Sequence, residues 1–351
     1  MGKGASLVWG KYRRTRFARR GPPGASSVPC TSASLPDCSS RSLPPFVNNP
    51  PPTGFNPSNN TAFGRIGLGC VTFGREIGEP EAFALMDHAI RLGVRLFDTA
   101  AAYGNGASER IIGRWFADRR PPAGTVVVAT KVLPPFSRER IADSVTESRR
   151  RLAPAPIGVL YLHKWDETAE RSDTLESLAR LAGRAEVPLL GASNFTAPQL
   201  RRALARQAAA GLRPFRVVQN NHNFAVRDVD PDLRHVCAAA GIAVVTYSPL
   251  GAGFLAGKHG AGVVPGSRLD VMPGHQRIYF TATTRARLAW LEAVAQRTGV
   301  SPTHLALAWA LHQPGPTTVL VGGRSPAHLD QAVAALQMSD AGILTALDDC
   351  P

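Results

Sequence analysis

The sequence predicts an α/β fold of the (β/α)8 class, a TIM barrel in a single domain, preceded by a disordered basic extension. Three observations lead to this prediction. From about residue 65 short β-branched runs alternate with segments of helical spacing, the alternation yields eight strands, and 44% of the 351 residues are hydrophobic, enough for a large core. The predicted strands are Arg65–Leu68, Arg95–Phe97, Thr125–Ala129, Ile157–Leu162, Leu189–Ala192, Val217–Gln219, Ala243–Thr246 and Thr318–Val321.

The segments between these strands read as helices. Apolar residues recur there at helical spacing, for example at Phe83, Met86, Ala89 and Ile90. At Ser301-Pro302 and Ser325-Pro326 a capping side chain precedes a proline, which is tolerated in the first helical turn, and Thr196 begins a looser version of the same signal. Strands that alternate with helices pair in parallel through right-handed crossovers, and eight such units favour closure into a barrel. An open doubly wound sheet would show G-x-G-x-x-G spacing, which Gly64–Gly74 lacks.

Residues 1–60 are rich in Arg, Ser and Pro and differ from the predicted barrel domain at 61–351. They carry eight Lys and Arg residues against the single acid Asp37, so half of the net charge of +14 lies there. Such a composition does not form a packed core, and we interpret the segment as disordered. It could be a transit peptide, an upstream extension of a misplaced start codon, or a solvated arm.

Composition also bears on partners and location. No run approaches the ~20 apolar residues that cross a bilayer, so no membrane association is expected. The barrel segment has no basic stripe interleaved with aromatic residues, and we expect no nucleic-acid partner. The five scattered cysteines form no CxxC or Cys/His cluster, which argues against a disulfide framework or a metal site. We expect a cytoplasmic protein, with organellar import through the extension left open.

Four polar side chains follow three successive predicted strands. Asp98 and Tyr103 come after the second strand, Lys131 after the third, and His163 after the fourth. Reactive groups of a barrel lie at the carboxyl ends of its strands, which are ~4.8 Å apart, so these side chains should converge on one mouth. Each has an ordinary structural explanation when taken alone, such as a helix cap for Asp98 or a core histidine for His163. Their coincidence at neighbouring strand ends favours a catalytic site.

The chemistry of the four groups is complementary. A phenol with a pKa near ~10 is a weak acid at neutral pH, and an ammonium within ~4–6 Å should lower that pKa. A carboxylate beside the lysine would keep it charged, and a histidine could hydrogen-bond a substrate oxygen. Together Asp98, Tyr103, Lys131 and His163 could deliver a proton to a carbonyl oxygen while a hydride reaches the carbon.

The sequence resembles the aldo-keto reductases over roughly residues 64–349. The resemblance rests on Phe97-Asp98-Thr99, Tyr103-Gly104, Ser108-Glu109, Ile112-Gly113, Ala129-Thr130-Lys131, Gly191-Ala192-Ser193-Asn194-Phe195, Gln219 and Tyr247-Ser248-Pro249-Leu250-Gly251. A lone D-T-x-x-x-Y would be weak, whereas Asp, Tyr, Lys and His at successive strand ends are specific.

The resemblance implies a role for each matching residue. Tyr103 would be the general acid, tuned by Lys131 and Asp98, and His163 would polarise the carbonyl. The nicotinamide would be held by Ser193, Asn194 and Gln219 and stacked on Tyr247. The remaining cofactor contacts would be Gly69, Cys70 and Val71 after the first strand, Ser248, Leu250, Gly251 and Gly253 in the loop 248–257, and Gly322, Arg324, Ser325 and His328 after the last strand.

Arg324 beside a helix N-terminus suits the 2′-phosphate of NADPH, whereas an NADH site more often presents a carboxylate. The family pattern is not matched everywhere: His328 and Ala332 replace the usual Gln or Arg and Asn, His222 replaces a Tyr, and Lys164-Trp165-Asp166 replaces x-Pro-Asp.

Three functions remain in competition. The first is an NADP(H)-dependent oxidoreductase that reduces a small-molecule aldehyde, ketone or keto-sugar to an alcohol. The second is an NADPH-binding sensor subunit similar to potassium-channel β-subunits, and the third is a nucleic-acid binder that acts through the basic extension. The complete set of four catalytic side chains favours the first. Its substrate pocket would be shaped by Val71, Phe73, Trp165 and the loop Lys258–Phe280.

Overall fold

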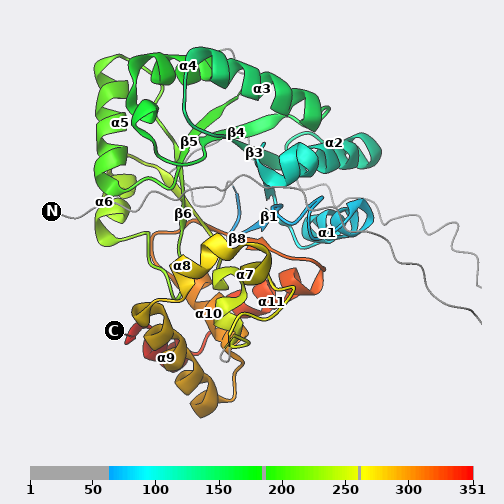
Figure 1. The fold of residues 1–351 in the computed structure, drawn as a ribbon, viewed down its shortest axis with the longest axis vertical. Coiled ribbons are helices and arrows are strands. Elements are labelled where there is room, and N and C mark those ends of the chain that lie inside the picture. Colours follow the sequence, from blue (N-terminus) through cyan, green and yellow to red (C-terminus); the bar gives the residue numbers. More distant parts are fainter. Residues whose placement is uncertain (1–62, 184–186, 260–261, 351) are drawn as a thin grey trace, which may run out of the picture. The chain divides into compact units, whose positions relative to one another are not determined.

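A computed structural model describes residues 63–183, 187–259 and 262–350 of the chain. Within these residues eight parallel strands close into a barrel in the order β1 to β8, each strand pairing with the next and β8 pairing with β1 (Figure 1). The predicted (β/α)8 fold is thereby confirmed, and every predicted strand overlaps an observed one. The strands are β1 Ile66–Gly69, β2 Leu96–Asp98, β3 Val127–Val132, β4 Ile157–Leu162, β5 Leu189–Ser193, β6 Val217–Asn221, β7 Ala243–Tyr247 and β8 Thr318–Gly322.

Helices follow the strands and surround them (Figure 1). The first six are α1 Glu79–Arg91, α2 Ala107–Arg119, α3 Arg138–Leu152, α4 Ser172–Gly183, α5 Ala197–Ala209 and α6 Pro231–Ala239, and short 3-10 turns η1 Tyr103–Gly106 and η2 Glu167–Glu170 precede α2 and α4. The connection from β7 to β8 holds η3 Gly251–Ala256, α7 Arg268–Val271, η4 Pro273–His275, α8 Gln276–Tyr279, α9 Ala282–Thr298 and α10 Pro302–His312. After β8 come α11 Ala327–Leu336 and α12 Ala341–Asp348.

Two apolar layers stabilise the barrel. Inside it, Phe63 precedes β1 and packs with side chains from the strands, among them Leu96, Val159 and Leu320. Between strands and helices lies the larger core, where helices α1 to α6 bury one face each. Gly191 on β5 is required by the packing of the inner layer, because a Cβ atom there would collide with the ring of Tyr161 on β4.

The predicted helix starts have different outcomes. Ser301 caps α10 by accepting from the His304 N–H at 3.3 Å, and at Thr196 the backbone N–H donates to Gln199 Oε1 at 2.8 Å. The prediction that Ser325 caps a helix is wrong. Helix α11 begins after Pro326, and the Ser325 hydroxyl contacts the His328 ring instead of capping the helix. The expected extension at 1–60 lies outside the described residues. No described helix is both long enough and apolar enough to span a bilayer.

Candidate active site

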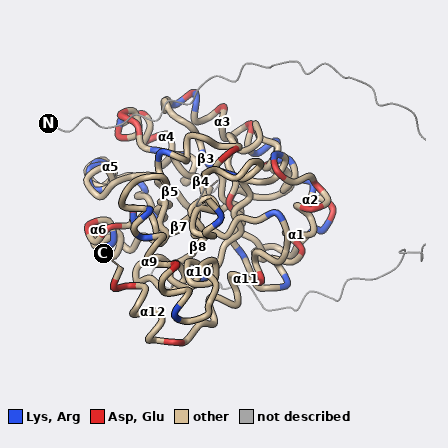
Figure 2. Tube along the Cα trace, turned by 60° about the horizontal axis from the view of Figure 1, so that its bottom comes forward, with Lys and Arg blue, Asp and Glu red and all other residues tan. Residues whose placement is uncertain are grey.

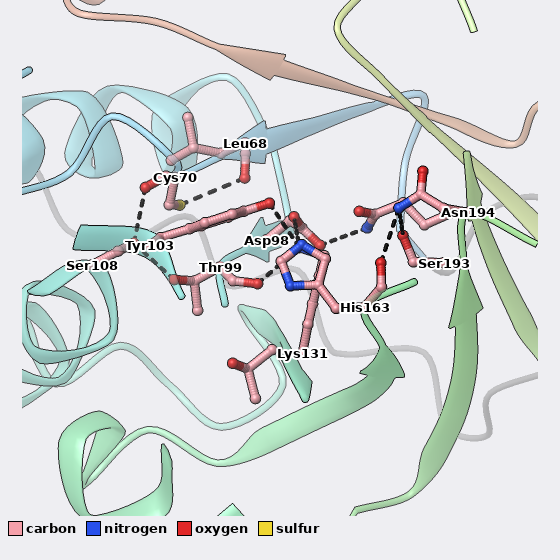
Figure 3. A network of polar contacts seen from close by, with 12 residues as sticks. Leu68, Cys70, Asp98, Thr99, Tyr103, Ser108, Lys131, His163, Ser193 and Asn194 are labelled. Carbon is pink, nitrogen blue, oxygen red and sulfur yellow. Dashed lines mark hydrogen bonds and ion pairs between the residues drawn. The ribbon is translucent and has the colours of Figure 1, made fainter. Parts of the chain in front are cut away.

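One buried carboxylate and one buried ammonium form the centre of the site. Asp98 ends β2 and Lys131 lies near the end of β3, and both side chains are almost fully buried. Lys131 Nζ donates to Asp98 Oδ1 at 2.5 Å, to the Thr99 carbonyl at 2.8 Å and to the Tyr103 hydroxyl at 3.3 Å (Figure 3). An ammonium has three protons, so each of them has an acceptor.

The ion pair keeps the lysine charged despite its burial. Burial alone would lower the pKa of Lys131, but the Asp98 carboxylate and the Tyr103 hydroxyl together outweigh that effect, and the pKa of Lys131 is raised. Burial raises the pKa of Asp98, and the Lys131 ammonium and the Gln219 amide oppose this shift. A charged ammonium therefore stands beside the phenol.

Tyr103 reaches the ion pair from the loop after β2. Its chain turns sharply into α2 through three left-handed residues, Gly104, Asn105 and Gly106, with φ of 56°, 52° and 77°. Its hydroxyl oxygen accepts from Lys131, which leaves the phenolic proton free for another acceptor. Burial raises the pKa of Tyr103 by more than Lys131 lowers it, so our expectation of a net lowering is not met in this structure.

His163 follows β4 and lies at the same mouth. Its ring meets the Tyr103 ring edge-on, with centroids 5.8 Å apart. Burial, with the Lys131 and Lys164 ammonium groups, lowers the pKa of His163 to about 3, so the imidazole is neutral near pH 7. Its buried Nδ1 atom has no hydrogen-bond partner among the described residues. A neutral ring with unused hydrogen-bonding capacity can bind a ligand oxygen.

Two hydrogen-bond networks from α2 hold the strand ends that carry these side chains. Ser108 Oγ donates to the Cys70 carbonyl at 2.8 Å and lies 2.7 Å from Thr99 Oγ1, which joins the ends of β1 and β2 to α2 (Figure 3). Glu109, also on α2 and fully buried, accepts from Thr130 at 2.6 Å and from Arg151 at 2.6 Å. The Ser108-Glu109 pair of the sequence motif therefore fixes β2 and β3 through buried hydrogen bonds.

The residues expected to hold a nicotinamide lie at the ends of β5, β6 and β7. Ser193 pairs with Gln219 across the β5–β6 ladder. Asn194, at φ 60°, donates to the His163 carbonyl at 2.9 Å and accepts from the Tyr247 hydroxyl at 2.6 Å. Gln219 Nε2 donates to Asp98 Oδ2 at 2.7 Å, a contact that the sequence did not predict. These residues and the four catalytic candidates are therefore brought together.

The loop after β7 has the backbone expected of a phosphate cradle. Ser248, Gly251, Ala252 and Gly253 all have positive φ, and the Ser248 carbonyl accepts from the Gly251 N–H at 2.8 Å. Leu250 has a negative φ and immediately precedes η3. The Lys258 ammonium lies 3.8 Å from where a Cβ of Gly253 would stand. This lysine was not singled out from the sequence.

The ends of β1 and β8 form the other part of the expected cofactor channel. Gly69 pairs with Gly322, and the Thr72 hydroxyl donates to the Gly323 carbonyl at 2.9 Å. Cys70 is buried, whereas Val71 is partly exposed. Arg324 is exposed directly before α11, and Ser325 and His328 contact each other at 3.1 Å. These three residues thus lie at the start of α11 rather than in the cluster around Lys131.

Arg268, on α7, was also missed by sequence reasoning. Its guanidinium pairs with Glu76 at 3.3 Å, which links the β7–β8 connection to the β1–α1 loop. Burial lowers the pKa of Arg268, and its charge contributes a lowering of the pKa of Tyr103. Little in the sequence indicated a role for Arg268, because a single arginine in the long β7–β8 connection belongs to no motif with a distinctive spacing.

The expected substrate pocket needs one correction. Phe73 is fully buried in the outer core and cannot contact a substrate, while Trp165 is half-buried with its indole N–H donating to Glu170 at 2.9 Å. Leu133, just beyond β3, is 44% exposed and presents apolar surface near the mouth. Phe73 was misjudged because its ring packs into the apolar core between strands and helices, which a sequence pattern does not reveal. Among the described residues no group of three or more His, Cys, Asp or Glu could hold a metal ion.

The chain is similar to known proteins along most of its length. The model of the Aldo/keto reductase family matches residues 65–346. The uncharacterized oxidoreductase YrpG of Bacillus subtilis (strain 168) is 30% identical over 309 residues, which cover 81% of this chain and 91% of that protein.

Two further relatives bear on function. The uncharacterized oxidoreductase Mb2320 of Mycobacterium bovis is 34% identical over 77% of this chain and 84% of its own length. A probable voltage-gated potassium channel subunit beta of Oryza sativa subsp. japonica is 26% identical over 76% of this chain and 85% of its own length. The arrangement of Asp98, Tyr103, Lys131 and His163 and the match over 65–346 agree: the chain belongs to the aldo/keto reductase family.

Proposed function

We propose that this protein is an NADP(H)-dependent oxidoreductase that reduces an aldehyde, ketone or keto-sugar to an alcohol, with Tyr103 as general acid. The observation that carries the proposal is the position of the Tyr103 hydroxyl, 3.3 Å from a buried ammonium and beside a neutral imidazole. An acid placed in this way can act on a carbonyl oxygen, a contribution typically worth ~10²–10⁴ in rate.

The residues present fit NADPH. The left-handed backbone at Gly251, Ala252 and Gly253 can approach a diphosphate closely, and Lys258 and Arg268 lie on the connection that follows it. The exposed Arg324 before α11 would hold the 2′-phosphate. Ser193, Asn194, Gln219 and Tyr247 would contact the nicotinamide. When bound, the cofactor supplies the hydride for the carbonyl carbon.

The side chains then divide the proton chemistry. The neutral His163 orients the substrate by donating a hydrogen bond to the carbonyl oxygen. Tyr103 transfers its phenolic proton to that oxygen as the C=O double bond becomes a C–O single bond. The resulting phenolate is stabilised by Lys131, whose charge is maintained by Asp98. In the alcohol-oxidising direction the same phenolate is the base, and the proton returns to it.

A second candidate is an NADPH-binding sensor subunit with little turnover. The similarity to the rice potassium channel subunit supports it. The reductase is favoured because a sensor has no need of a proton donor backed by a buried ion pair.

The two candidates separate in a single experiment. NADPH oxidation is followed at 340 nm with a panel of aldehydes, ketones and keto-sugars for the wild type and Tyr103→Phe, and NADPH binding is measured by quenching of protein fluorescence. We expect turnover by the wild type, a loss of ~10²–10⁴ in kcat in the variant, and equal NADPH binding by both. Tight NADPH binding without turnover of any carbonyl would favour the sensor.

A further inference from the structure

We infer that Gln219 is a positioning residue for proton transfer, which fixes the Asp98 carboxylate so that Lys131 stays within reach of Tyr103. The inference rests on the proposed function, and it gives Gln219 a role beyond contact with the cofactor.

The geometry around the carboxylate is the basis of the inference. Gln219 Nε2 donates to Asp98 Oδ2 at 2.7 Å, while Asp98 Oδ1 accepts from Lys131 at 2.5 Å. Both Gln219 and Asp98 are 2% exposed, so water cannot replace the amide easily. A carboxylate only accepts hydrogen bonds, and therefore the amide must present its nitrogen to Asp98. The two oxygens thus have one strong donor each.

The backbone of Gln219 is itself held firmly. It lies in β6, paired with Ser193 on β5 and Val245 on β7, and its carbonyl accepts from the Asn194 N–H at 2.9 Å. Asp98 lies on β2 and Gln219 on β6, so the donor to Asp98 comes from the opposite side of the eight-stranded barrel. A side chain in this position prevents the carboxylate from rotating away from Lys131.

Loss of the amide donor would weaken the contact between Lys131 and Tyr103. A carboxylate without its second donor is more basic and attracts the ammonium more strongly, which lengthens the weaker 3.3 Å bond to Tyr103. The negative charge on Asp98, which already raises the pKa of Tyr103, would also be less compensated. Both effects raise the pKa of Tyr103. The other titratable or charged groups that face this pair are Cys70, Tyr161, His163, Tyr247 and Arg268. Burial raises the pKa of Tyr161 and the Gln219 side chain opposes that shift, so Tyr161 is affected by the substitution as well, and its signal is read separately from that of Tyr103.

The test measures ionisation of Tyr103 directly. The chain is labelled with tyrosine carrying ¹³C at Cζ, which gives one signal for each of its five tyrosines, and the Tyr103 signal is assigned with Tyr103→Phe. In Gln219→Met we expect the ratio of phenolate to phenol at pH ~10.5 to fall at least about three-fold below that of the wild type, corresponding to a pKa higher by ~0.5. Gln219→Leu should behave in the same way.

A matched control is available on α5. Gln207 is fully buried and donates to the Arg213 carbonyl at 3.1 Å, away from Asp98, so Gln207→Met should leave the Tyr103 signal unchanged. An unchanged Tyr103 titration in both folded Gln219 variants would overturn the inference, even if NADPH binding became weaker.

A measurement on the unmodified chain covers variants that do not fold. One side-chain amide proton of Gln219 should exchange with D2O at least about ten-fold more slowly than the other, because it is bound to Asp98. Equal rates would contradict the inference. Neither measurement needs cofactor or turnover, so failure of the proposed function in the carbonyl assay remains a separate result.

Discussion

At the scale of single residues, Asp98 organises the site. Its two oxygens bind Lys131 and Gln219, and Lys131 in turn binds the Thr99 carbonyl and the Tyr103 hydroxyl. Because a buried carboxylate needs partners for both oxygens, its neighbours are fixed by its own requirements. Because the Tyr103 hydroxyl oxygen accepts from Lys131, its phenolic proton remains available to a ligand.

The ionisation state of His163 is a testable property at this scale. Burial lowers its pKa to about 3, below the unfolded value near ~6.5, so the ring is neutral from pH ~5 to ~8. The unfolded chain binds a proton at this histidine more readily than the folded chain does. The free energy of unfolding therefore decreases as the pH falls from ~6.5 toward the pKa of the folded state. The ¹³Cε1 signal of His163, assigned with His163→Asn, should therefore not titrate between pH ~5 and ~8.

The result that would contradict this assignment is a midpoint near pH ~6.5, the value of an unperturbed histidine.

Sequence reasoning located the four catalytic candidates but not every contact between them. Asp98, Tyr103, Lys131 and His163 could be placed because strand ends meet at one edge of a barrel, whatever the details of packing. The Gln219–Asp98 bond joins residues 121 positions apart, and it depends on which way two side chains turn inside the closed barrel. The net pKa of Tyr103 also depended on burial, which a sequence does not quantify.

At the scale of elements, the connection between β7 and β8 carries much of the site. Its loop at 248–257 has left-handed backbone at Ser248, Gly251, Ala252 and Gly253, and α7 contributes Arg268. The ion pair from Arg268 to Glu76 and the contact from Arg75 to Met272 at 3.8 Å join this connection to the β1–α1 loop. The strands were predictable from their periodicity, whereas α7 and α8 are too short to leave a periodic signal.

The start of α11 allows a prediction about cofactor choice. We proposed that Arg324 holds the 2′-phosphate of NADPH, a charge-assisted contact that would be worth ~1.5–3 kcal/mol. On that proposal Arg324→Ala should raise the KM for NADPH about 10–100-fold while the KM for NADH stays constant. Initial rates with each cofactor measure this directly. Arg297→Ala, which removes an exposed arginine from α9, is the control. Equal changes for both cofactors would place the 2′-phosphate elsewhere.

At the scale of the whole molecule, the eight-stranded barrel is complete within the described residues. Its interior begins with Phe63, 4% exposed, and its outer core engages helices on all sides. Basic and acidic residues are interspersed over α1, α2 and α3 (Figure 2). Half of the net charge of the sequence belongs to residues 1–60. We could predict the fold from the repeating pattern, because closure follows from the number of units.

This organisation predicts that residues 1–60 are dispensable for chemistry. A chain that begins at Thr61 keeps Phe63 and all eight strands, so it should retain wild-type kcat and a Tm within about 2 °C. Scanning calorimetry and the 340 nm assay check both quantities. Loss of activity toward every carbonyl would show that the extension completes the site.

In the proposed reaction a hydride reaches a carbonyl carbon while Tyr103 protonates its oxygen. The most direct measurement uses NADPH deuterated at the transferable C4 position, with the alcohol product analysed by mass spectrometry. We expect one deuterium on the former carbonyl carbon for the wild type, and at least about a hundred-fold slower product formation by Tyr103→Phe with NADPH binding intact. A product without deuterium, or equal rates for the two proteins, would contradict it.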